Sequence, residues 1–493
     1  GVNNVGLGNN TLFQNTGGGQ NTAVGHQALQ NNTTNNNSAF GYKALFANTT
    51  GIYNVAVGTS ALTSNTIGLK NSAVGFGALF NNTIGSNNSA FGYKALFANT
   101  IGVSNTAVGY QVLLNNTTGN NNTALGFQAL RTNTASNNTA VGQSALLANT
   151  TGINGTAVGS LSLDANTTGN YNVALGTLSL SANTTADANT GLGYAALTAN
   201  TTGASNVAIG REALVANTTG AENVAVGAYA LDANTTANSN VSVGVESLTA
   251  NTTGATNVAV GTGALKTNTT ASNNTAVGNF ALRQNTTGAD NTATGSQSLQ
   301  LNTTGSSNSA FGRYALLNNT TAYQNTAVGR SALQETTTGA NNTGLGYRAL
   351  YLNTTGSENT AVGRLCLDAN TTGQDNVAIG NSALGGNTTA SNNTAVGSAA
   401  LLANTTGTQN VALGYNSLGS NTGSYNTAVG HGSGSSNTSG GVTALGQSSL
   451  ESNTTGAGNT AIGQNSMQAN TTGSSNVALG YATLDANTTA DNN

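Results

Sequence analysis

A repeat of 17 residues runs through the whole chain and constrains its fold more than any other feature. Aligned on the pattern Asn-x-Ala-x-Gly, the repeat begins at Asn4, Asn21, Asn37 and Asn54, and a typical unit reads N-T-A-V-G-x-x-A-L-x-x-N-T-T-G-x-x. We number the repeat positions 1 to 17 from this Asn and call each unit a coil, so that about 29 coils fill the 493 residues. A repeat this short is one supersecondary unit that buries its apolar side by stacking on its neighbours.

Several repeat positions tolerate almost no change of residue type. Position 5 is Gly in every coil, position 3 is Ala, Gly or Ser, and position 12 is Asn except at Thr336. Position 9 is Leu except at Gly434 and Met467, and position 4 is aliphatic or Phe except at Thr294. A disordered chain has no physical reason to hold such a register, so the sequence predicts an ordered repeat.

The charged side chains mark the surface of that repeat. All 11 basic and 14 acidic residues fall at positions 6, 7, 10, 11, 16 or 17. Because unpaired charge is costly to bury, the remaining positions are expected to be buried or stacked. Four coils lack one residue, always between positions 13 and 17, which identifies that segment as an adaptable turn.

The pattern predicts an all-β fold, a parallel β-solenoid of the β-roll or β-helix type. Two short strands per coil are expected, at positions 1–5 and 7–11, joined by the position-5 Gly and by the Asn-Thr-Thr-Gly turn. We expect one continuous, uncapped repeat solenoid over residues 1–493, belonging to a longer chain or fibre. The expected core consists of position-4 and position-9 side chains facing each other, and the expected bends are the position-5 glycines: Val24 with Leu29, Phe40 with Leu45, Val57 with Leu62, and Gly25, Gly41 and Gly58.

The position-12 asparagines have two competing interpretations. Stacked coils would align them in a ladder that satisfies their amides along the axis. However, Asn-Thr-Thr also fits the acceptor pattern for N-glycosylation. The ladder is favoured, and both interpretations apply to the same side chains, of which these are examples: Asn32, Asn48, Asn149, Asn166 and Asn217.

Small residues at positions 3 and 8 suggest that something packs closely against the coil. Position 3 is expected to point away from position 4 and therefore toward the outside. Lateral association of chains is the favoured explanation, with a homotrimer or an end-to-end fibre as the assembly. A local backbone constraint is the alternative.

The pattern N-[TSV]-A-[VLIF]-G-x-x-[AS]-L resembles repeats of very large bacterial surface proteins and phage tail-fibre proteins, some of which end in an endosialidase-type chaperone domain. It is also similar to the head repeats of trimeric, YadA-like autotransporter adhesins, which are left-handed parallel β-rolls associated as trimers. This resemblance implies a structural protein located outside the cell, at the cell surface or on a virion.

The expected function is that of a non-catalytic extracellular filament or adhesin stalk. A phage tail-fibre shaft is one alternative, and an ice-binding solenoid that presents Thr rows from positions 13 and 14 is another. Besides self-association, glycans and host or cell surfaces are the candidate partners. The net charge of −3 gives no basic footprint for nucleic acid, and no apolar run is long enough for membrane insertion.

No catalytic, metal-binding or cofactor-binding constellation is visible, and no cofactor is expected. The two histidines, His26 and His431, both occupy position 6 and lie about 24 coils apart. Cys366 occupies position 8, where it is interpreted as a small buried residue.

Overall fold

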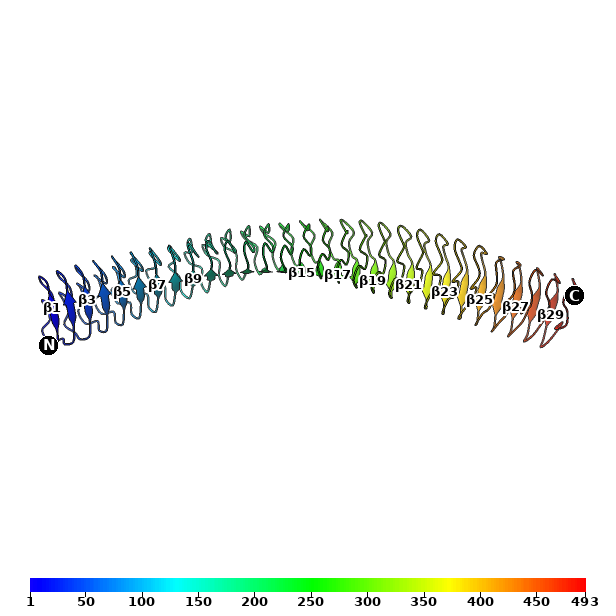
Figure 1. Ribbon diagram of the computed structural model, residues 1–493, viewed down its shortest axis with the longest axis horizontal. Helices are drawn as coiled ribbons and strands as arrows, with labels where there is room; N and C mark the ends of the chain where they lie inside the picture. The colour runs from blue at the N-terminus through cyan, green and yellow to red at the C-terminus, as the bar shows by residue number, and fades with distance from the viewer. The chain divides into compact units, whose positions relative to one another are not determined.

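A computed structural model describes residues 1–493 (Figure 1), and its secondary structure consists of 29 short strands without a helix. The chain forms two compact units, residues 1–245 and residues 246–493. Each unit is a parallel β-solenoid with the expected 17-residue period. A single continuous solenoid over 1–493 stays a prediction.

The first unit contains fifteen strands of three residues, one in each coil. They are β1 (Val5–Leu7), β2 (Thr22–Val24), β3 (Ser38–Phe40), β4 (Val55–Val57), β5 (Ser72–Val74), β6 (Ser89–Phe91), β7 (Thr106–Val108), β8 (Thr123–Leu125), β9 (Thr139–Val141), β10 (Thr156–Val158), β11 (Val173–Leu175), β12 (Thr190–Leu192), β13 (Val207–Ile209), β14 (Val224–Val226) and β15 (Val241–Val243).

The second unit contains fourteen strands of the same length. They are β16 (Val258–Val260), β17 (Thr275–Val277), β18 (Thr292–Thr294), β19 (Ser309–Phe311), β20 (Thr326–Val328), β21 (Thr343–Leu345), β22 (Thr360–Val362), β23 (Val377–Ile379), β24 (Thr394–Val396), β25 (Val411–Leu413), β26 (Thr427–Val429), β27 (Thr443–Leu445), β28 (Thr460–Ile462) and β29 (Val477–Leu479).

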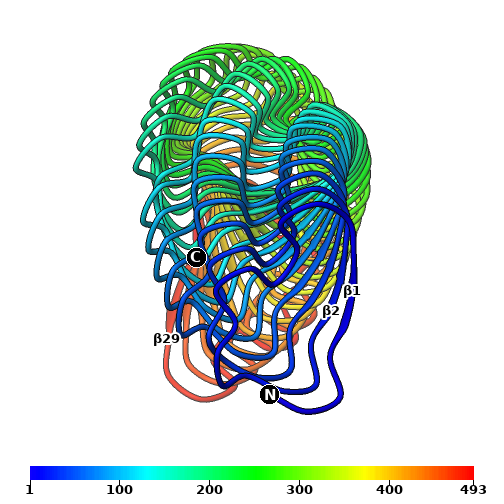
Figure 2. The same ribbon diagram turned by 90° about the vertical axis from the view of Figure 1, so that its left-hand side faces the viewer.

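Within each unit, every strand pairs in parallel with the strand of the next coil. Val55 lies beside Ser72 and Val57 beside Val74, so equal repeat positions form columns. The short coils keep this register, since Thr22 lies beside Ser38. Figure 2 shows the consequence in the first unit, where the blue coils follow one another with nearly the same outline. The deleted residues are absorbed in the turn, as the sequence predicts.

The second strand expected at positions 7–11 is absent, and this expectation is wrong. Positions 7 and 9 adopt the left-handed conformation, with φ of 62° at Gln27 and 49° at Leu29. Alternating left-handed residues cannot form an extended strand. The segment nevertheless bonds to the next coil, because the Leu29 backbone N–H donates to the Ala44 carbonyl at 3.0 Å. It is therefore a stack of turns rather than a second sheet.

The core prediction is wrong at position 4. Val24 is half-buried, and Phe40 and Val57 are 40% and 36% exposed, because the strand directs position 3 inward and positions 2 and 4 outward. Leu29, Leu45 and Leu62 at position 9 are fully buried. They pack with the Ala residues of positions 3 and 8, such as Ala23, Ala28, Ala39 and Ala44, which are also fully buried.

Position 3 is small because the interior is narrow, and this corrects the expectation that it faces a neighbouring chain. A Cβ added to Gly344, at position 3, would lie 3.2 Å from Leu333 Cγ and 3.3 Å from the Ala349 carbonyl oxygen. Even alanine is therefore tight there. The local constraint explains positions 3 and 8, and the small residues give no argument for lateral association.

Candidate functional site

The position-5 glycines create the bend that closes each coil. Their φ angles are near 130°, for example 130° at Gly25, 136° at Gly41 and 129° at Gly58. A Cβ on Gly25 would lie 2.6 Å from the Gly41 carbonyl oxygen of the next coil. Both the conformation and the close approach of adjacent coils require glycine.

The position-12 asparagines form the expected ladder. Asn48 Nδ2 donates to Asn32 Oδ1 at 2.7 Å, and Asn65 Nδ2 donates to Asn48 Oδ1 at 2.7 Å. The same Nδ2 of Asn48 also donates to the Gly51 carbonyl at 2.9 Å, which closes the turn of its own coil. Each amide thus links two coils and fixes one turn.

A second ladder runs along position 1. The backbone N–H of Asn54 donates to Asn37 Oδ1 at 3.0 Å. Asn37 Nδ2 donates to the Gly51 carbonyl at 2.8 Å, the same oxygen that accepts from Asn48. Both ladders therefore meet at one carbonyl of the turn. In the short coil that begins at Asn21, the Thr34 carbonyl accepts from both Asn21 and Asn32, so the deletion keeps both hydrogen bonds.

The glycosylation hypothesis is incompatible with this arrangement. The side chain of Asn166 is 1% exposed, and those of Asn32, Asn48, Asn149 and Asn217 are fully buried. A glycan would replace a hydrogen on the Nδ2 that these residues use for the ladder, and it would need an open path to solvent. The structure assigns these residues to the ladder alone.

Threonines at position 13 form a third set of links between coils. Thr49 Oγ1 donates to the Thr66 carbonyl at 3.0 Å, and Thr66 Oγ1 donates to the Thr83 carbonyl at 3.0 Å. These hydroxyl hydrogens are therefore used inside the solenoid. Of the two Thr rows expected to be available for ice binding, at positions 13 and 14, only the position-14 row keeps free hydroxyl donors.

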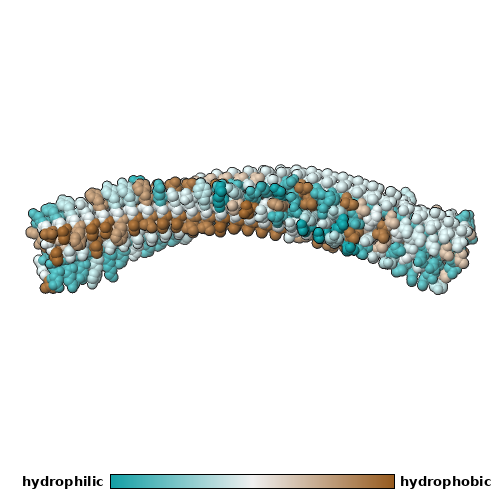
Figure 3. All heavy atoms as spheres, viewed as in Figure 1, coloured by the Kyte–Doolittle hydropathy of each residue, from teal (hydrophilic) through white to brown (hydrophobic).

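The side chains of repeat positions 2 and 4 form the outer face of the sheet, which we call the sheet face. Position 2 is Thr, Ser or Val, and position 4, which is aliphatic or Phe except at Thr294, supplies an apolar stripe. Phe91, Leu125 and Leu175 are 41%, 46% and 39% exposed. Figure 3 shows the stripe in brown along the strands of the first unit. No charged residue occupies position 2 or 4 in any coil.

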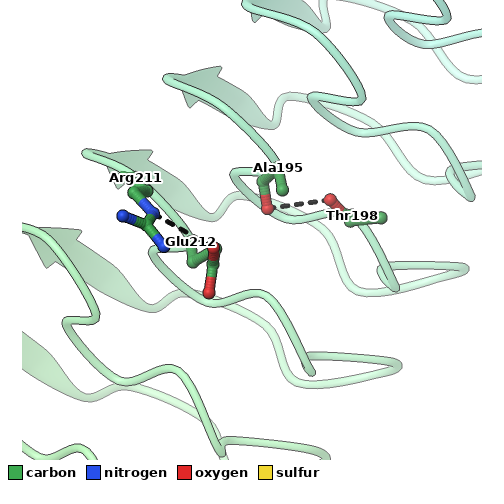
Figure 4. A network of polar contacts seen from close by, with 4 residues as sticks. All are labelled: Ala195, Thr198, Arg211 and Glu212. Atoms are coloured by element: carbon green, nitrogen blue, oxygen red, sulfur yellow. Dashed lines mark hydrogen bonds and ion pairs between the residues drawn. The ribbon is translucent and has the colours of Figure 1, made fainter.

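Charged residues lie outside the strands, and a few of them form ion pairs. Arg211 Nε donates to Glu212 Oε1 at 3.2 Å between neighbouring residues, and Thr198 Oγ1 donates to the Ala195 carbonyl at 2.8 Å in the preceding coil (Figure 4). The hydrogen bond to Glu212 raises the pKa of Arg211 above its usual value. Solvent screens such pairs, so they add little to stability.

Aromatic residues at position 6 stack in columns where successive coils carry them. Phe76, Tyr93, Tyr110 and Phe127 form a four-ring stack with ring centroids 5.1 to 5.5 Å apart. The structure does not bring the two histidines together. His26 stacks on Tyr42 at 5.7 Å, and in the other unit His431 stacks on Tyr415 at 5.2 Å.

Cys366 is fully buried, and its Sγ donates to the Gly363 carbonyl at 3.2 Å. Burial raises the pKa of this thiol to about 12. The neutral form is a poor nucleophile near neutral pH.

Two other kinds of feature are absent from the structure. No three His, Cys, Asp or Glu side chains are grouped as metal ligands. No helix has the length and apolar character to cross a membrane.

Sequence reasoning missed a cluster of arginines and tyrosines in coils β19 to β22. Four of the 11 basic residues lie between residues 313 and 364, and that local density was the available signal. Tyr314, Arg330, Tyr347, Arg348 and Tyr351 line an open groove there.

No known family model matches the chain, and no curated protein was found to be similar to it. The geometry therefore defines its class as a repetitive parallel β-solenoid, held by asparagine ladders, without assigning it to a family.

Proposed function

We propose that this protein is a non-catalytic structural element, a spacer or shaft in an extracellular filament, adhesin stalk or tail fibre. The observation that carries this proposal is the stacking of equivalent coils in each unit, which three sets of links hold together. Those links are the strand ladder, the asparagine ladders and the position-13 threonines. A repeat whose every coil is built alike sets a length and offers little unique geometry for chemistry.

The sheet face supports a further part of this proposal, lateral packing against other copies of the chain. The face repeats once per coil, about every 4.8 Å. A second copy has the same period, so its apolar side chains match the stripe along many coils. Because positions 2 and 4 carry no charge, such packing would not bury an ionised group. The number of copies and end-to-end association stay predictions.

The ice-binding alternative receives less support. It requires regular rows of free Thr hydroxyls, and the position-13 hydroxyls donate to carbonyls of the next coil. A solution of the chain is expected to show no thermal hysteresis.

The spacer role can be tested by changing the number of coils. In a Cys366→Ala background, spin labels at Thr50→Cys and Thr219→Cys are both on exposed turn positions of the first unit. They are ten coils apart, and thus roughly 48 Å apart along the stack. Deleting residues 155–188, two whole coils, should shorten the measured distance by about 10 Å and keep it narrow.

Deleting only residues 155–162 is the matched control, because it removes half a coil and breaks the register. A broad distance distribution is expected for that variant. An unchanged distance after the two-coil deletion would contradict the spacer role. Immunogold labelling of intact cells or particles tests the extracellular location, and labelling only after lysis would refute it.

A further inference from the structure

Four arginines occupy four consecutive coils of the second unit. Arg313, Arg330 and Arg364 stand at position 6 of the coils that contain β19, β20 and β22, and Arg348 stands at position 7 of the coil that contains β21. These strands pair directly, so the four coils that carry the arginines follow one another at about one strand spacing, ~4.8 Å. We call this group the arginine row.

Tyrosines hold part of the arginine row in place. The Arg313 guanidinium lies over the Tyr314 ring with its central carbon 4.4 Å from the centroid, and that of Arg348 lies over the Tyr351 ring at 4.0 Å. These cation–π contacts restrict long side chains that would otherwise be mobile. The charge therefore stays on the surface at fixed places instead of being spread over many rotamers.

Two members of the arginine row, Arg330 and Arg348, line the open groove, which has a volume of about 290 Å³. Leu317, Gln334 and Tyr347 contribute apolar, amide and phenol groups to its wall, beside Arg330 and Arg348. The Nε of Arg348 is buried and has no hydrogen-bond partner. Cationic and aromatic side chains around a groove of this size suit the binding of an anionic ligand.

None of the four arginines forms an ion pair with a carboxylate of the chain. The nearest acids are otherwise engaged. Glu335 accepts hydrogen bonds from Asn318 and Gln334. Asp368 is half-buried, and burial raises the pKa of its carboxyl group, which Arg348 lowers in part. No guanidinium group of the arginine row is therefore held at ion-pair distance by a carboxylate, although Glu335, Glu358, Asp368 and Asp375 lie in the same coils.

We propose that the arginine row and its groove bind an acidic polysaccharide, a chain of sugars with one carboxylate per residue. An extended pyranose chain advances by a distance close to one strand spacing per sugar, so successive carboxylates can meet successive guanidinium groups. The planar fork of arginine accommodates a carboxylate with two parallel N–H donors. The tyrosine hydroxyls and Gln334 can bond to the sugar hydroxyls.

A single-stranded nucleic acid fits the same surface less well. Base recognition without sequence preference depends on open aromatic faces. Here guanidinium groups cover a face of Tyr314 and of Tyr351. The site adds a binding activity to the solenoid and does not depend on the proposed spacer role.

Calorimetric titration of the full chain with oligogalacturonate, a polymer with one carboxylate per sugar, tests the proposal. Binding should weaken at least tenfold in the Arg313→Gln/Arg330→Gln variant and fall as the salt concentration rises. Arg330→Lys should lose part of the affinity, because it keeps the charge but not the fork. Arg211→Gln is the matched control, since Arg211 is also an exposed position-6 arginine but is already paired with Glu212, and it should change affinity less than twofold.

Three results would overturn the proposal. The first is the absence of binding to oligogalacturonate at low salt. The second is an equal loss of affinity in Arg211→Gln, which would indicate non-specific attraction. The third is equal or tighter binding of a neutral oligosaccharide or of a single-stranded oligonucleotide of the same length. Because the substituted arginines Arg313 and Arg330 are exposed, the variants should unfold like the parent chain, and circular dichroism verifies this.

Discussion

Asn217 Nδ2 donates to Asn200 Oδ1 at 2.8 Å, across one coil boundary of the first unit. The same nitrogen donates to the Gly220 carbonyl at 2.9 Å, and Asn217 Oδ1 accepts from Asn234 Nδ2 at 2.8 Å. A single fully buried side chain thus makes three hydrogen bonds and touches three coils. Such a residue is expected to contribute far more to stability than its small apolar area suggests.

Asn217→Ala should therefore destabilise the first unit by about 2–4 kcal/mol, since it leaves buried partners on two neighbouring coils unsatisfied. Because coils interact only with their neighbours, the loss should appear as faster hydrogen exchange around residues 200–240. Thr202→Ala is the control, because Thr202 is exposed, and it should change stability by less than about 0.5 kcal/mol. Equal effects of the two substitutions would contradict the structural role of the ladder.

Thr336 interrupts the position-12 ladder in the second unit. It is fully buried, and neither its Oγ1 nor Oδ1 of Asn319 in the preceding coil has a hydrogen-bond partner. Thr336→Asn should supply the missing amide donor and stabilise the second unit by about 1–2 kcal/mol. Denaturant unfolding of the full chain measures this change. A loss of stability would mean that the coil has relaxed around threonine and cannot accept the longer side chain.

The sequence predicted the solenoid, the period, the adaptable turn and the asparagine ladder because these follow from which positions stay constant. It did not predict correctly which side chains of the strand point into the coil and which point outward. Position 4 looked like core because it is aliphatic, yet Phe40 and Val57 lie on the outer face. An apolar residue on an outer sheet face gives the same sequence pattern as one in a core. The small residues at positions 3 and 8 were the true sign of the narrow interior.

The prediction of a second strand was wrong because of the backbone conformation at positions 7 and 9. Position 9 is left-handed in every coil, and a residue preference can reveal this only indirectly. Leu appears there almost without exception, while the other large aliphatic residues Val and Ile never do. A β-branched side chain is strongly disfavoured at positive φ. The preference for Leu over Val and Ile was therefore a backbone signal, although it looked like one of core packing. The arginine row was missed because a periodic sequence draws attention to what repeats.

Leu163 offers a test of this backbone constraint. It is fully buried with φ of 52°. Leu163→Ile keeps the volume but places a β-branched residue at positive φ, and should cost about 1–3 kcal/mol. Leu163→Met should cost less than about 1.5 kcal/mol, as the natural Met467 at the same repeat position suggests. Thermal unfolding measures the stability of both variants. Equal stability of the two would show that packing alone selects leucine.

The buried thiol of Cys366 predicts a dependence of stability on pH. Its pKa is raised to about 12 in the folded chain, against an ordinary value of 9.0, because burial disfavours the thiolate. The contribution is fully present below pH 9 and is lost as pH rises toward 12, since only the unfolded chain releases the proton. The midpoint of denaturant unfolding should therefore fall more steeply above pH 9 than in Cys366→Ala.

Reaction with a thiol reagent at pH 8 checks the same burial independently. Native Cys366 should react far more slowly than the denatured chain. A Cys366→Ala/Thr372→Cys variant, with its thiol on an exposed turn, should react rapidly in the native state. Rapid labelling of native Cys366 would show that the interior of its coil opens readily.

Lateral packing through the sheet face makes a prediction for the assembled state. Leu175 and Leu192 lie side by side on adjacent strands, and each is 39% exposed. Replacing both with lysine places charge in the centre of the stripe, where desolvation would oppose association. Analytical ultracentrifugation should show a loss of assembled species, while the far-ultraviolet circular dichroism stays unchanged.

Leu161→Lys provides the comparison, because Leu161 is 36% exposed but lies on the turn at position 7, away from the stripe. If the Leu161 variant dissociated equally, added charge in general would be responsible. If neither variant changed the assembled mass, another surface would have to join the chains, because the sheet face tolerates lysine at its centre.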